Sequence, residues 1–70
     1  MAILKINGNE RQFKAGSLPA TIAALLEHLN LNAATVVAEI DGIIVKRDKF
    51  AETKLTDGQS IELVRFVGGG

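Results

Sequence analysis

The pattern at the start of the chain is typical of two short β-strands joined by a turn. Residues 2–7 are rich in residues that suit a strand, a turn signal follows them, and residues 10–14 can return as the second strand of a hairpin. The turn contains Asn7-Gly8, a pair that readily adopts the left-handed backbone of a two-residue hairpin turn. The sequence therefore predicts a β-hairpin over residues 2–14.

The period of the apolar positions changes after residue 20. Four apolar residues now follow the spacing i, i+3, i+4 and i+7, which puts them on one face of a helix. Thr21 is a plausible N-cap because its hydroxyl can accept a hydrogen bond from a free backbone N–H of the first turn. Ser17 is the alternative cap, which leaves the helix start open by about four residues. The apolar stripe consists of Ile22, Leu25, Leu26 and Leu29.

The second half of the chain returns to strand-like patterns. Residues 35–40 and 43–46 predict two strands joined at Asp41-Gly42, and residues 60–67 predict a last strand after Asp57-Gly58. Residues 47–56 are polar and irregular, with room for one helical turn. One helix has a single stripe to bury, and a mixed sheet of four or five strands offers one face for it. The pattern indicates an α+β domain in which the first and last strands are neighbours.

Alternation along the last two long strands also predicts an exposed apolar patch. If Ile61 and Leu63 face the helix, Val64 and Phe66 point to solvent on the opposite face. The same argument for residues 35–40 turns Val37 outward. An apolar patch near the end of the chain is a candidate docking site for a partner, although single exposed apolar residues are ordinary. The predicted patch consists of Val37, Val64 and Phe66, ringed by Glu39 and Glu62.

Composition narrows the functional classes. The chain has 70 residues, which indicates one domain, and it has no cysteine, which excludes disulfides and thiolate metal sites. Eight acidic and eight basic side chains cancel, so the net positive charge typical of nucleic-acid binders is missing. The first residues, MAILKING, lack the long apolar run of a signal peptide, and no segment suits a membrane span. We expect a cytoplasmic protein without nucleic-acid or membrane partners.

The side chains offer no obvious catalytic or metal site. His28 is the only histidine, and it has no second ligand or acidic partner at metal spacing, so we expect a surface histidine. The carboxylates are scattered, and no glycine-rich phosphate-binding motif is present. Three of the aspartates stand near turns, where such side chains typically bind backbone groups: Asp41, Asp48 and Asp57. We therefore predict a protein that is not an enzyme and binds no metal or cofactor itself.

The remaining feature is the C-terminal sequence RFVGGG. Glycines lack side chains, so such a segment can enter a narrow channel in extended form and bring a carboxylate to another protein's reactive site. A carboxylate is a poor electrophile and needs activation, for instance as an acyl-adenylate made from ATP. The alternative is a frayed end without a function. We expect residues 68–70 to be flexible, because little offsets the entropy of ordering them.

Residues 36–70 carry a resemblance to a known family. The chain resembles the ThiS family of sulfur carriers, which are related to ubiquitin and have the β-grasp fold. The similarity covers nearly the whole chain; Lys46, Gln59 and Asp41 depart from residues frequent in the family, all at turns or strand edges. The small subunit of molybdopterin synthase is a weaker match. Positions that carry the resemblance include Ile44, Val45, Arg47, Phe50, Leu55, Asp57, Gly58 and the glycines.

The resemblance implies a β-grasp domain over residues 1–67 and a mechanism for the tail. A ThiF-like, E1-like partner would use ATP and magnesium to adenylate the Gly70 carboxylate. A sulfur donor such as a cysteine desulfurase would convert it to a thiocarboxylate, and a ThiG-like thiazole synthase would accept the sulfur for thiamin. Gly68 and Gly69 would thread the partner's active site. The alternatives are a carrier for molybdopterin, cysteine or tRNA thiolation, or an interaction module with an inert tail.

Overall fold

The computed structural model describes residues 1–66, and residues 67–70 lie outside the described part. The mixed sheet and single α-helix of these residues confirm the predicted α+β class. Most elements end within a residue or so of their expected boundaries. The last strand ends at Arg65, and residue 67, where the predicted strand and the predicted domain end, lies outside the described residues. The elements in chain order are β1 (Ala2–Ile6), β2 (Asn9–Phe13), α1 (Ile22–His28), η1 (Ala33–Thr35), β3 (Val36–Ile40), β4 (Ile43–Val45), η2 (Arg47–Lys49) and β5 (Ser60–Arg65).

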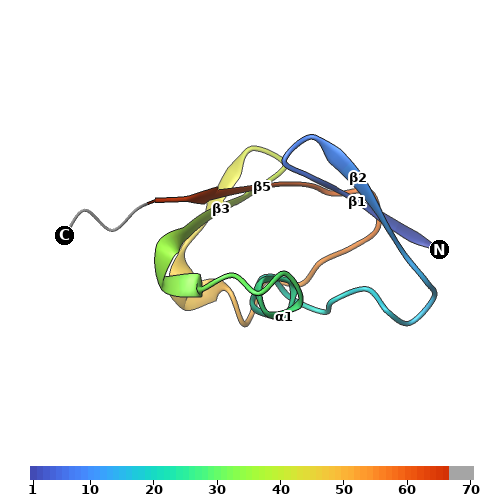
Figure 1. Ribbon diagram of the computed structural model, residues 1–70, viewed down its shortest axis with the longest axis horizontal. Coiled ribbons are helices and arrows are strands. Elements are labelled where there is room, and N and C mark those ends of the chain that lie inside the picture. The colour runs from blue at the N-terminus through green and yellow to red at the C-terminus, as the bar shows by residue number, and fades with distance from the viewer. Residues whose placement is uncertain (67–70) are drawn as a thin grey trace.

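The five strands form one sheet in the order β2-β1-β5-β3-β4. The first and last strands are neighbours, as predicted, and they run parallel, whereas the other pairs are antiparallel. Figure 1 shows α1 lying across one face of the curved sheet. The opposite face of the sheet, which we call the open face, has no element over it in the described chain (Figure 1). The end of β5 that continues to the C-terminus lies far from the N-terminus (Figure 1).

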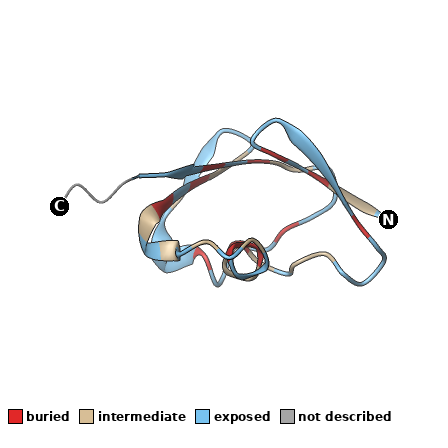
Figure 2. Cartoon of the chain, viewed as in Figure 1, coloured by how far each residue is buried: buried red, intermediate tan, exposed pale blue. Residues whose placement is uncertain are grey.

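The core lies between the sheet and α1. Three residues of the predicted stripe, Ile22, Leu25 and Leu26, are at most 1% exposed, whereas Leu29 follows the helix and is partly buried. Figure 2 shows buried residues on both the sheet and α1. The sheet and the segment between β4 and β5 complete the core with Leu4, Ile6, Phe13, Val36, Ala38, Phe50, Leu55, Ile61 and Leu63.

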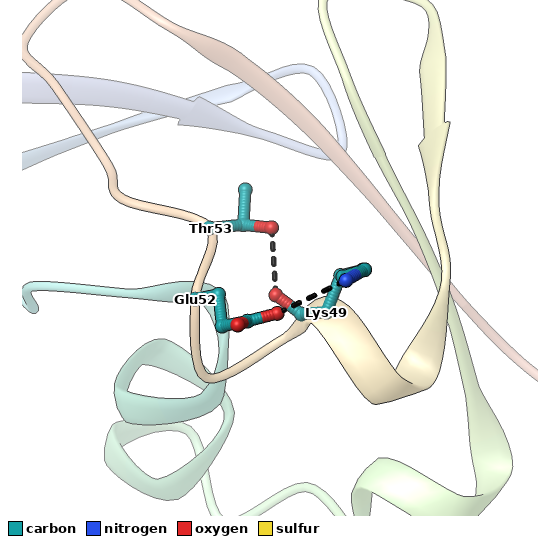
Figure 3. Close-up of polar contacts among 3 residues, drawn as sticks. All are labelled: Lys49, Glu52 and Thr53. Carbon is teal, nitrogen blue, oxygen red and sulfur yellow. Dashed lines mark hydrogen bonds and ion pairs between the residues drawn. The ribbon is translucent and has the colours of Figure 1, made fainter.

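The segment over residues 47–56 contributes more to the fold than its polar sequence indicates. It contains the expected helical turn, η2, but it also buries Phe50 and Leu55. After η2, Thr53 Oγ1 donates a hydrogen bond to the backbone carbonyl of Lys49 at 2.7 Å (Figure 3). The side chain of Lys49 also forms an ion pair with Glu52 (Figure 3). Both ends of that ion pair are more than 60% exposed, so it contributes little stability. The polar residues of the segment thus set a turn that directs two apolar side chains inward.

Both ends of α1 have their free backbone groups satisfied. Thr21 is the N-cap, as predicted, and its Oγ1 accepts from the N–H of Ala24 at 3.1 Å. The N–H groups of Ile22 and Ala23 donate to carbonyls of the 47–56 segment, so that this segment also closes the N-terminal end of the helix. At the other end Asn30, with a φ of 59°, ends the helix in the left-handed conformation.

Two tight turns set the register of the hairpins. Asn7 and Gly8 have φ of 51° and 84°, and Asp41 and Gly42 have φ of 49° and 85°. Positive φ at both central residues is the type I′ geometry that matches the twist of the flanking strands. Asn7 therefore belongs to the turn and not to the first strand, where the sequence pattern had placed it. Thr35 was likewise expected in a strand and is the last residue of η1.

Candidate functional site

The open face of the sheet carries all five residues of the predicted docking patch. Val37 pairs with Val64, and Glu39 pairs with Glu62, so each pair leaves the same face side by side. Val37 is 39% exposed and Val64 is 54% exposed. Phe66 continues the alternation one residue beyond β5; its N–H donates to the carbonyl of Thr35, and 44% of the residue is exposed. Figure 2 shows this end of β5 as exposed.

A sixth residue, Ile44, belongs to the same surface and was missed from the sequence. It pairs with Glu39 across the β3–β4 hairpin and is 65% exposed. The signal was present, because a two-residue turn at Asp41-Gly42 pairs Ile40 with Ile43 and therefore places Ile44 beside Glu39. We define the apolar strip as Val37, Ile44, Val64 and Phe66.

Part of the apolar strip lies on β5, the strand that leads to the glycines. β5 is the middle strand of the sheet, held by β1 on one side and β3 on the other. The predicted sulfur-carrying residue Gly70 and the predicted threading residues Gly68 and Gly69 lie outside the described residues. The structure describes the chain up to Phe66, one residue beyond the end of a central strand whose open face carries Glu62 and Val64.

Residues 1–66 contain no cluster of potential metal ligands and no detectable pocket. His28 is exposed at the end of α1, with its ring 5.8 Å from that of Phe13. Within the described chain, the only α-helix is α1, which is too short to cross a bilayer.

Two of the three turn aspartates bind backbone groups. Their partners are distant in the sequence and do not belong to the same turns. Asp57 Oδ1 accepts from the N–H of Ile3 at 2.7 Å, and Asp41 Oδ1 accepts from the N–H of Ser60 at 3.0 Å. Asp48 makes no side-chain hydrogen bond with residues 1–66. Asp57 thus holds the backbone near the start of β1, and Asp41 holds the start of β5.

Comparison with known proteins identifies the family. The model of the ThiS family matches residues 4–70. The chain is 34% identical over 68 residues to the sulfur carrier protein ThiS of Bacillus subtilis, covering 97% of this chain and 100% of that protein. The chain belongs to the ThiS family.

Solved structures and a longer relative extend this result. The crystal structure of the thiamine biosynthesis protein ThiS from Geobacter metallireducens matches with a TM-score of 0.81 and 30% identity, over 97% of this chain and 99% of that one. The match confirms the β-grasp fold of this ThiS-like chain. A thiazole synthase of Paramagnetospirillum magneticum is 39% identical over 67 residues, which are 96% of this chain but only 20% of that protein. The chain thus spans about a fifth of the length of this longer relative.

Proposed function

We propose that this ThiS-family protein carries sulfur as a thiocarboxylate on Gly70 and delivers it to thiazole synthase in the cytoplasm. The supporting observation is that the similarity to the ThiS family extends through Gly70 and covers the whole of the Bacillus subtilis sulfur carrier. The chain acts as a carrier and not as an enzyme. Its partners supply the chemistry, and ATP and magnesium belong to the adenylating enzyme.

The proposed reaction has two stages. An E1-like adenylating enzyme joins the Gly70 carboxylate to AMP and releases pyrophosphate. A persulfide sulfur, supplied by a donor such as a cysteine desulfurase, then attacks the acyl carbon and expels AMP. A thiol reduces the resulting sulfur–sulfur bond and leaves the thiocarboxylate. Glycine suits this role because its acyl carbon has no side chain to hinder attack, and Gly68 and Gly69 are slender enough to enter a narrow channel.

We further propose that the adenylating enzyme and thiazole synthase dock on the open face of the sheet. A partner that receives the glycines must also contact the surface from which they extend. The apolar strip is the exposed apolar surface next to that point, and such surfaces mark interaction sites when they are contiguous. The similarity to part of a longer thiazole synthase supports that enzyme as the sulfur acceptor.

The test is the intact mass of the protein after incubation with ATP, magnesium, a cysteine desulfurase with cysteine, and the adenylating enzyme. We expect a gain equal to the exchange of one oxygen for one sulfur, mapped to Gly70. Omission of ATP must abolish the gain. A protein that stays unmodified beside an adenylating enzyme proven active on another carrier would overturn the proposal in favour of an interaction module. A thiocarboxylate that thiazole synthase does not accept would point to another product.

A further inference from the structure

Two carboxylates stand directly opposite each other on the open face. Glu39 of β3 and Glu62 of β5 are register partners in the row next to the Val37–Val64 pair. Directly opposed residues in an antiparallel pair have Cβ atoms about 4.5–5.5 Å apart, so like charges in these positions repel and destabilise the sheet. Glutamate is also depleted in strands, where β-branched and aromatic residues pack better. The pair is therefore unfavourable to folding by position and by residue type.

Within residues 1–66, neither carboxylate of this pair takes part in an ion pair. The single ion pair among residues 1–66 joins Lys49 to Glu52, away from the open face. Two basic residues are equally near by register: Lys5 pairs with Ser60, two residues before Glu62, and Lys46 follows by two residues Ile44, the partner of Glu39. Neither lysine makes an ion pair with either glutamate. A local conflict that nothing in the fold relieves is typical of a functional position.

The surroundings of the pair are apolar on two sides. Ile44 stands beside Glu39 on β4, and Val37 and Val64 form the next row toward the chain's end. Because two residues of a strand span about 6.7 Å, Glu62 lies about 13 Å from Phe66 along β5. A partner that covers the apolar strip would also exclude water from the two carboxylates. Dehydrated charges are costly unless a charge of opposite sign meets them.

We propose that the Glu39–Glu62 pair receives an arginine side chain from thiazole synthase. This inference rests on the proposed function, because it names the chemistry of the docking surface assigned there. A guanidinium group has five N–H donors in a planar fork, so one arginine can bind both carboxylates at once. Its weak hydration and flat faces also suit the apolar neighbours Ile44 and Val64. The arginine is expected about 13 Å from the position that receives Phe66, on the side away from the glycines.

The test measures the dissociation constant of the wild-type protein with the thiazole synthase of the same organism at low and moderate salt. The variants are Glu39→Gln and Glu62→Gln, which keep the side-chain shape and remove one charge. We expect each to weaken binding roughly tenfold and to lessen the salt dependence. Their melting temperatures should stay equal or rise, since the repulsion between the two carboxylates is removed. The matched control is Glu52→Gln, an exposed glutamate away from the open face, which should leave binding unchanged.

The outcomes separate this inference from the proposed function. If both glutamine variants bind as tightly as the wild-type protein while Val64→Asp binds more weakly, the proposed arginine contact is overturned. The docking surface itself would then stand. A loss of affinity that matches a loss of thermal stability would assign the pair a structural role and overturn the inference. Absence of binding between wild-type protein and thiazole synthase would overturn both.

Discussion

The side chain of Asn7 holds the backbone of Leu63 as a neighbouring strand would. Its Oδ1 accepts from the N–H of Leu63 at 2.7 Å, and its Nδ2 donates to the carbonyl of Leu63 at 3.1 Å. The backbone N–H of Asn7 donates to the carbonyl of Ile61 at 2.9 Å. At this point β1 has already entered its hairpin turn, so the amide side chain extends the ladder along β5 after the backbone has left it. One residue thus closes a hairpin and secures the strand that leads to the glycines.

Replacement of Asn7 by glycine should lower the free energy of unfolding by about 1–3 kcal/mol, because two partly buried backbone groups of Leu63 lose their partner. Glycine tolerates the positive φ, so the turn itself remains possible. Urea unfolding followed by circular dichroism measures the change. The matched control is Asn30→Gly, which has a φ of 59° and no side-chain hydrogen bond within the described chain. An equal loss in both variants would show that the side-chain bonds of Asn7 contribute nothing.

Phe50 and Phe66 should respond differently to replacement by alanine. Phe50 is 3% exposed and Phe66 is 44% exposed. We expect Phe50→Ala to cost about 3–5 kcal/mol, which approaches the whole stability of a small domain. Phe66→Ala should cost less than about 1 kcal/mol while weakening partner binding. Thermal unfolding compares the two, and similar melting temperatures would contradict the assignment of Phe50 to the core.

Much of the fold follows from periodicity and turn chemistry. The helix stripe, the Thr21 cap and the hairpin at Asn7-Gly8 are local features, so the sequence contains the information that specifies them. The orientation of Val37 and Val64 follows from the period of a strand and from which face meets the helix. The register between β3 and β5 is different, because the two strands are far apart in the chain. The opposition of Glu39 and Glu62 therefore emerges only from the structure.

The residues that sequence analysis misjudged act through contacts distant in the chain. Phe50 and Leu55 stand in a segment without periodicity, and their burial depends on how that segment meets the start of α1. Asp57 binds the N–H of Ile3, a contact across most of the chain that no local pattern encodes. Ile44 is the exception, because the two-residue turn before it already determines which face of the sheet it occupies.

The start of α1 can be tested by removing each of the two candidate caps. Thr21→Ala should cost about 1 kcal/mol, because the N–H of Ala24 loses its acceptor. Ser17→Ala should change the free energy of unfolding by less than about 0.5 kcal/mol, since no side-chain hydrogen bond of Ser17 occurs within residues 1–66. Denaturant titration of both variants gives the comparison. A larger effect at Ser17 would mean that the helix begins earlier than Ile22.

The role of the open face in docking is tested with a charge placed inside the apolar strip. Val64→Asp should weaken binding to the adenylating enzyme and to thiazole synthase by at least tenfold, because a carboxylate would be dehydrated at the interface without a partner. Ile43→Asp is the matched control, since Ile43 is 71% exposed but pairs with Ile40 and lies outside the apolar strip. Isothermal titration calorimetry measures both. Equal affinities for the two variants would remove the open face from the docking model.

The strictest prediction concerns the carboxylate itself. One alanine added after Gly70 should abolish sulfur loading. The new terminal carboxylate would extend beyond the position from which it attacks the α-phosphate of the ATP bound to the adenylating enzyme, and a methyl group would stand beside the acyl carbon. The melting temperature should not change, since all buried core residues of the described chain lie between Leu4 and Leu63. Intact mass after the loading reaction measures the outcome, and a variant with one alanine before Met1 serves as the control for length. Normal loading of the C-terminally extended protein would show that the enzyme does not select Gly70, and the proposed mechanism would have to be abandoned.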